Sequence, residues 1–354
     1  MFCLDVHARW QCRHSGACCS AGWAIPIEGP AFERVRLHFG GRAGRLFKTG
    51  GPLPEGAAAI LETSRGACVF FDEPAGRLCA IHRDLGPDAL PVACRQFPRQ
   101  ALKDTRGVFV TLSHYCPTAA ALLIDRPSLT VGSAPGNLRL GGELEGLDAM
   151  EALPPLLTED LLTDLPGYDA WERAGLAVLA SHPGTAADAI AAIGIATGRL
   201  TAWRPGAMDL AEATRTAFID PAATAEEATF AADIRRASMA VASVPRGLDT
   251  PDVPRAESDG AWQDAAAVLE AHDAGVRTYL GSRLFGNWIA YYGHGLATVV
   301  EYLRICHAVL RLEAMRARDT GSPRQRMIES FRAADRLLVH LVDVRALASL
   351  IEES

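Results

Sequence analysis

The chain has 354 residues, is 49% hydrophobic and carries a formal net charge of −7. This length is enough for a sizeable hydrophobic core and for two domains. The acidic balance argues against a general nucleic-acid binder, which would usually present a basic face.

The N-terminal residues do not indicate a secretory signal peptide, and the most apolar stretch does not indicate a membrane span. The charged residues Asp5, Arg9 and Arg13 exclude the apolar segment of a secretory signal peptide. The longest uncharged apolar stretch, residues 284–300, contains three glycines and is shorter than the roughly 20 residues that cross a bilayer. We therefore expect no membrane span, a broken or paired buried helix at that stretch, and a cytoplasmic location.

The first third of the chain shows little regular periodicity and is rich in glycine, proline and arginine. We expect one amphipathic helix at residues 30–39, because Phe32, Val35 and Phe39 recur at helical spacing. Short strands are expected at residues 68–71 and 108–112, and a helix at 119–124. Residues 1–125 are therefore predicted to form an irregular domain with short strands.

A glycine-rich connector, residues 131–146, is expected to be a linker or a hairpin around residues 137–140. From residue 147 the sequence becomes rich in alanine and leucine, which predicts an all-helical C-terminal domain over residues 147–354 and a mainly α protein. Thr224 with Glu227 three residues on is the pattern of a capping box, which indicates a helix start. The expected helices are 154–162, 171–180, 185–195, 208–217, 224–243, 261–279, 299–317 and 325–350.

The cysteines are concentrated at one end of the chain. Eight of the nine lie within the first 116 residues, about a third of the length. Buried structural thiols are one explanation, and it suits Cys306 in its apolar helical run. An extracellular disulfide framework is another, but it conflicts with the expected compartment, where clustered thiols more often serve metal or redox chemistry. We therefore predict a zinc ion or an iron–sulfur (4Fe-4S) cluster.

The first two of four cysteine motifs suggest how ligands could converge. Cys12 is followed closely by the adjacent pair Cys18 and Cys19, and an intervening glycine would let the backbone turn. Thiolates are soft anionic donors that suit zinc and iron. Cys68 and Cys79 flank a turn, so a hairpin would bring them together. His82, which follows this hairpin, is the less favoured ligand and fits a surface or supporting role better.

The other two motifs add charge and a helix start. In Cys94-Arg95-Gln-Phe-Pro-Arg99, the two arginines could offset the charge of a cysteine-ligated cluster or clamp a carboxylate or phosphate. Capping of nearby helix ends is the alternative. Cys116 directly precedes Pro117 at a predicted helix start, where the helix dipole favours a thiolate.

In this order, the four motifs resemble the flagellin lysine-N-methylase family and the broader YkgJ-type cysteine-cluster domain, a zinc- or iron-chelating module. The resemblance covers residues 10–123 and is weaker at residues 278–286. Related domains often have a cysteine where this chain has Ser15, and an acidic residue near Pro117. The resemblance implies more thiols than one zinc ion or one cluster needs, and the candidate ligands are Cys12, Cys18, Cys19, Cys68, Cys79, Cys94 and Cys116.

The resemblance further implies a protein-lysine N-methyltransferase that uses S-adenosylmethionine and acts on lysine side chains of a protein substrate. No glycine-rich dinucleotide loop is present. The cofactor would therefore bind between the cysteine-rich part and the helices, with Arg95, Arg99, His114 and Tyr115 as candidate contacts. The alternative is a non-catalytic protein that metal holds together and whose helical part binds a protein partner. An oxygenase is less favoured, because no set of two histidines and one carboxylate stands out.

Overall fold

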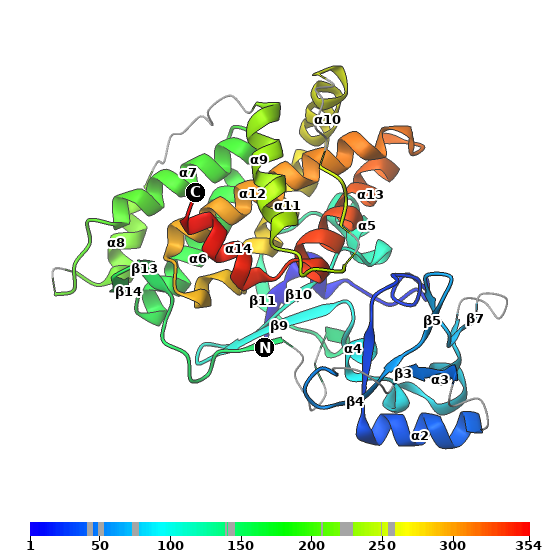
Figure 1. The fold of residues 1–354 in the computed structure, drawn as a ribbon. Helices are drawn as coiled ribbons and strands as arrows, with labels where there is room; N and C mark the ends of the chain where they lie inside the picture. The colour runs from blue at the N-terminus through cyan, green and yellow to red at the C-terminus, as the bar shows by residue number, and fades with distance from the viewer. Residues whose placement is uncertain are drawn as a thin grey trace.

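The computed structural model describes residues 1–40, 45–48, 53–72, 78–138, 140, 146–206, 208–219, 229–248, 250–253 and 259–354. Over these residues the protein is mainly helical, with small sheets in its first half (Figure 1). Among them, no helix combines the length and the apolar character needed to cross a bilayer.

A five-stranded sheet lies at the centre of the molecule, with the strand order β11-β1-β10-β9-β12. The hairpin of β9 and β10 forms its middle, and β1 pairs with β10 in parallel. The sheet joins distant segments, since β11 adds to β1 at one edge and β12 adds to β9 at the other. Its strands are β1 (Phe2–Leu4), β9 (Arg99–Asp104), β10 (Gly107–Leu112), β11 (Val131–Ser133) and β12 (Gly146–Asp148).

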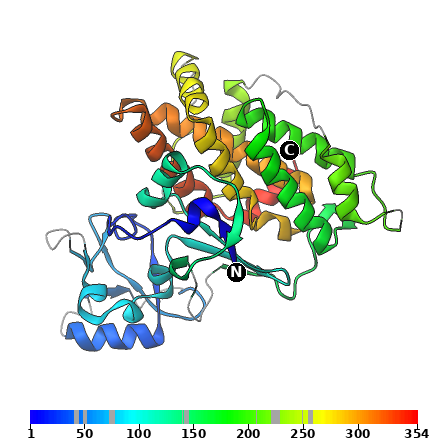
Figure 2. The ribbon, with the colours of Figure 1, turned by 180° about the vertical axis from the view of Figure 1, so that it is seen from behind.

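Helices from residue 117 onward pack against this sheet and enclose the larger hydrophobic core (Figures 1 and 2). Leu102 and Phe109 of the sheet and Leu123 of α5 are buried in the same cluster as the helices, so the sheet belongs to this core. The helices are α5 (Pro117–Asp125), α6 (Leu165–Ser181), α7 (Ala186–Leu200), α8 (Leu210–Ala217), α9 (Phe230–Ala242), α10 (Asp259–Ala271), α11 (Asp273–Leu284), α12 (Leu296–Arg316), α13 (Pro323–Asp335) and α14 (Val344–Glu352).

A second, smaller core lies among the cysteine motifs, at the lower right of Figure 1. Ile27, Val35 and Phe70 are buried in it, and α2 covers one side. Its elements are short because glycines, prolines and turns interrupt the chain. They are β2 (Ile25–Glu28), α2 (Gly29–Phe39), β3 (Phe47–Lys48), β4 (Ala57–Leu61), β5 (Thr63–Ser64), β6 (Ala67–Cys68), β7 (Phe71–Asp72), β8 (Leu78–Cys79), α3 (Ala80–Leu85) and α4 (Val92–Gln96).

These two cores divide the chain differently from the expected limits. Leu4, Leu102 and Phe109 lie before residue 125 but are buried with the helices. Shared burial of this kind does not define domain limits, so the limits of 1–125 and 147–354 stay a prediction. The mainly α prediction is confirmed, and so are the helix at 30–39, the strand at 108–112 and the helix at 119–124.

The C-terminal part was expected to be all-helical, but it contains a β-hairpin. The predicted helix at 154–162 is instead a hairpin of β13 (Leu156–Thr158) and β14 (Leu161–Leu162). Two adjacent prolines precede it, and prolines donate no backbone hydrogen bond. The hydroxyl and amide of Thr163 both donate to the carbonyl of Pro155, which closes the hairpin. Local hydrogen bonds therefore outweigh the leucine content of this segment.

Several other helices and strands in the structure have limits that differ from the expected ones. Residues 131–133 form β11 and residue 146 begins β12, at opposite edges of the sheet. The expected linker or hairpin around residues 137–140 falls partly outside the described residues, which exclude 139 and 141–145. The expected capping box at 224–227 lies outside them too, and the described helix α9 follows Thr229, whose hydroxyl accepts from the Ala232 amide. The expected helix 261–279 is divided at His272. The expected helix 325–350 contains a π-helical segment, η6 (Arg336–Leu341), before α14.

Candidate functional site

The adjacent cysteines Cys18 and Cys19 lie on a tight turn. Gly16 has a positive φ of 75°, and its carbonyl accepts hydrogen bonds from the amides of Cys19 and Ser20. Glycine adopts this backbone conformation without the strain that a side chain would add. The turn places the two Sγ atoms 4.0 Å apart.

Cys68 and Cys79 come to the same place from other segments. The amide of Cys68 donates to the carbonyl of Cys19 at 2.7 Å, which joins the first motif to the second. Cys79 pairs with Phe71 across the β7–β8 hairpin, whereas Cys68 pairs with Thr63 in the separate β5–β6 hairpin. The expected strand at 68–71 is therefore divided, and the prediction that one hairpin joins Cys68 to Cys79 is wrong. We call Cys18, Cys19, Cys68 and Cys79 the four-thiol group.

Hydrogen bonds within the four-thiol group shift the pKa values of its members in opposite directions. The side-chain hydrogen bond with Cys19 lowers the pKa of Cys18 and lowers that of Cys79 to about 7. These same two hydrogen bonds raise the pKa of Cys19 well above its usual value. Burial raises the pKa of Cys68 to about 11. Two of these sulfurs are thus disposed to become thiolates, the form that binds metal.

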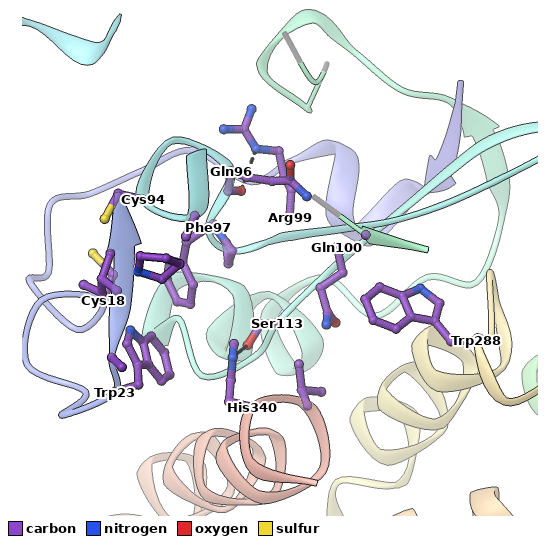
Figure 3. A pocket seen from close by; sticks show the side chains of 17 residues that line it. Cys18, Trp23, Cys94, Gln96, Phe97, Arg99, Gln100, Ser113, Trp288 and His340 are labelled. Carbon is purple, nitrogen blue, oxygen red and sulfur yellow. Dashed lines mark hydrogen bonds between the residues drawn. The ribbon is translucent and has the colours of Figure 1, made fainter. Parts of the chain in front are cut away.

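The remaining predicted thiols have different surroundings. Cys12 is exposed. Cys116 is buried at the start of α5, where burial raises the pKa of its thiol. Cys94 lines a pocket together with Cys18 (Figure 3). Among the described residues, no three His, Cys, Asp or Glu side chains are already grouped closely enough to hold a metal ion.

The pocket beside Cys18 and Cys94 has a volume of about 300 Å³. Aromatic side chains form much of its wall, with Trp23 and Phe97 on one side and Trp288 on the other (Figure 3). Arg99, Gln96 and Gln100 contribute polar groups. A largely apolar cavity with a few polar groups is the usual form of a small-molecule site.

Of the four predicted cofactor contacts, Arg99 is the one that lines the pocket. Arg95 is exposed. His114 is fully buried, and its Nδ1 lies 3.0 Å from an Oδ2 of Asp335. The Tyr115 ring packs against Trp23, with the ring centroids 5.0 Å apart, but Tyr115 is not among the residues that line the pocket.

Buried side chains from the C-terminal helices lie at or near the pocket. The sequence analysis did not predict them. His340, in η6, reaches Ser113 Oγ with its Nε2 at 2.6 Å, and both residues line the pocket (Figure 3). Asp335, at the end of α13, lies 3.7 Å from Arg283 Nη1. Ser113 and Arg283 stand within segments that carry the family resemblance. His340 has no neighbouring sequence signal, because only the fold brings it to Ser113.

Arginine and histidine hold the Asp335 carboxylate in its charged form. Arg283 and the hydrogen bonds from His114 keep the pKa of Asp335 well below its usual range, despite burial. Because His114 directs Nδ1 to Asp335, its Nε2 faces the Nε2 of His7 at 3.2 Å. Burial lowers the pKa of both histidines, so this chain of side chains carries its negative charge on Asp335. Comparisons of the chain with protein-family models, curated proteins and solved structures return no match.

Proposed function

We propose that the protein binds a metal ion or an iron–sulfur cluster through the four-thiol group. The observation that carries this proposal is the 4.0 Å separation of the Cys18 and Cys19 sulfurs. Two thiolates on one tetrahedral zinc ion, each about 2.3 Å from the metal, lie about 3.8 Å apart. The spacing of the first two donors therefore fits a shared zinc ion with little movement.

The surroundings of these thiols support the same proposal. The hydrogen bond from the Cys68 amide to Cys19 and the β7–β8 pairing fix the backbone on which all four thiols stand. Four thiolates also satisfy an iron–sulfur cluster, so the chemistry of the donors admits both.

Metal analysis of anaerobically purified protein tests the proposal. We expect about one equivalent of zinc, or iron with acid-labile sulfide and a brown colour. Cys18→Ser and Cys79→Ser should each remove most of the metal. Cys12→Ser is the matched control, because the Cys12 thiol is exposed and outside the four-thiol group.

Two outcomes would contradict this assignment. Protein without metal or sulfide, obtained from metal-supplemented cells, would end the metal proposal. Equal metal loss from Cys12→Ser and Cys18→Ser would show that the ligands are a different subset of the seven predicted cysteines.

Lysine methylation is a second proposal, and it rests on the family resemblance. The position of the pocket supports a catalytic role over a purely structural one, because Cys18 lies in both the pocket wall and the four-thiol group. Calorimetry with S-adenosylmethionine and metal-loaded protein is the direct test. We expect binding that Arg99→Ala weakens, and an absence of heat on titration would exclude the methyltransferase.

A further inference from the structure

We propose that the pocket has an acyl-transfer activity in which Ser113 is the nucleophile and His340 the general base, with carboxylic esters of small aromatic or short-chain acids as substrates. The proposal does not rest on bound metal. The observation that carries it is the hydrogen-bond contact between Ser113 and His340 within one cavity. A nucleophile in contact with a base is the arrangement that activates a serine hydroxyl.

Backbone pairing holds Ser113 at the cavity. Its amide donates to the carbonyl of Pro98 at 2.7 Å, so it continues the β9–β10 pairing by one residue. Its Oγ accepts from the Tyr115 amide at 3.3 Å, and this leaves the hydroxyl proton for His340. Only 1% of Ser113 is exposed, so the cavity it lines is its route to a ligand.

The π-helical segment η6 presents His340 to the cavity beside Ser113. Single π turns within helices occur often at functional sites, because the extra residue redirects side chains. The His340 ring packs against Trp23, with the ring centroids 4.4 Å apart, which fixes its orientation. Burial lowers the pKa of His340 to about 4, so the imidazole is neutral and its Nε2 can accept the serine proton.

A carboxylate and an amide near the Ser113–His340 pair could assist the reaction. The Asp335 carboxylate acts on His340 so as to favour the imidazolium that forms, while Arg283 opposes it. Arg283 also donates to Gln100 Oε1 at 3.4 Å, which leaves the Gln100 amide as the hydrogen-bond donor of that side chain. Gln100 stands two residues from Pro98, the partner of Ser113, so it lies diagonally on the same face of the sheet.

The reaction balances with water as the second substrate. Ser113 Oγ bonds to the ester carbonyl carbon as its proton passes to His340 Nε2, and Gln100 donates to the developing oxyanion. Collapse breaks the bond to the alcohol oxygen, which takes the proton from His340. Water then attacks the acyl-serine and gives a proton to His340, and Ser113 regains a proton as the carboxylic acid leaves.

A fluorophosphonate probe with peptide mass spectrometry, alongside hydrolysis of p-nitrophenyl butyrate, tests the proposal on the whole chain. We expect phosphonylation of Ser113 in the wild-type protein and its loss in Ser113→Ala. His340→Gln should slow labelling at least 100-fold, because a positioned general base contributes about 10²–10⁴ in rate. Ser330→Ala is the control, since that buried hydroxyl on α13 donates to the Arg326 carbonyl.

Wild-type protein decides the outcome even if a variant fails to fold. Folded wild-type protein without label on Ser113 would overturn the proposal and leave the Ser113–His340 bond as a clamp between η6 and the sheet. Hydrolysis by folded Ser113→Ala at the wild-type rate would overturn it as well. Because labelling and metal content are measured separately, failure of one proposal is distinguishable from failure of the other.

Discussion

The cysteine-bearing region and the helical region achieve stability in different ways. In the first, strands of two to five residues surround a small core around Ile27, Val35 and Phe70. In the second, helices such as the 21-residue α12 enclose a core that extends from Leu4 to Ile351. A small core contributes little stability, and such regions often depend on metal ions or other cross-links. The comparison teaches that the proposed metal site, the four-thiol group, lies in the region with the smaller core.

Removing bound metal is the sharpest test of that comparison. A strong chelator should raise the hydrogen-exchange rates of amides in β2, β4 and β6 at least 100-fold, or about 2.7 kcal/mol. Amides in α12 should keep their protection, because their core contains no proposed ligand. Mass spectrometry of exchange with and without chelator measures both regions in one sample. A uniform loss of protection, or no loss, would contradict the difference between the regions.

Breaking the ion pair inside the helical region tests the other side of the comparison. Asp335 is fully buried beside Arg283, so Asp335→Asn leaves an uncompensated buried charge. We expect a loss of about 3 to 5 kcal/mol in the free energy of unfolding, measured with urea. Asp125→Asn is the control, because it breaks the exposed pair with Arg324 and should cost less than about 1 kcal/mol. Equal losses in the two variants would refute the distinction.

Acid should weaken the helical region through His307 on α12. Burial, with Arg311 and Arg236 nearby, lowers the pKa of His307 to about 3. In the unfolded chain His307 takes up a proton near pH 6.5, whereas in the folded protein it stays neutral until about pH 3. The free energy of unfolding therefore has the full contribution of neutral His307 above pH 6.5 and loses it as the pH falls toward 3. At pH 5 the loss is about 2 kcal/mol.

His307→Gln removes this dependence and provides the measurement. Urea unfolding at pH 7.5 and pH 5 should show that the variant gains about 2 kcal/mol relative to the wild type on acidification. Parallel losses in the two proteins would mean that other groups carry the acid sensitivity.

Local patterns in the sequence predicted local structure well. The spacing of Phe32, Val35 and Phe39 indicated α2. The turn expected before Cys79 is present in the β7–β8 hairpin, although Cys68 belongs to the β5–β6 hairpin instead. The hairpin at residues 156–162 was missed, because the leucines suggested a helix while the hydrogen bonds of Thr163 to Pro155 decided otherwise. Hydrogen bonds of this kind are hard to recognise from residue types alone.

The sequence by itself determined the concentration of thiols, the four motifs and the mainly helical second half, since these depend on residue types and their spacing. Only the tertiary structure decided that Cys18 lies in a pocket wall and that Cys94 lines the same cavity. It also decided the contact of Ser113 with His340, 227 residues further along the chain. The physical reason is that helix and strand formation depends on near neighbours, whereas such contacts arise only when the large core packs η6 against the end of β10.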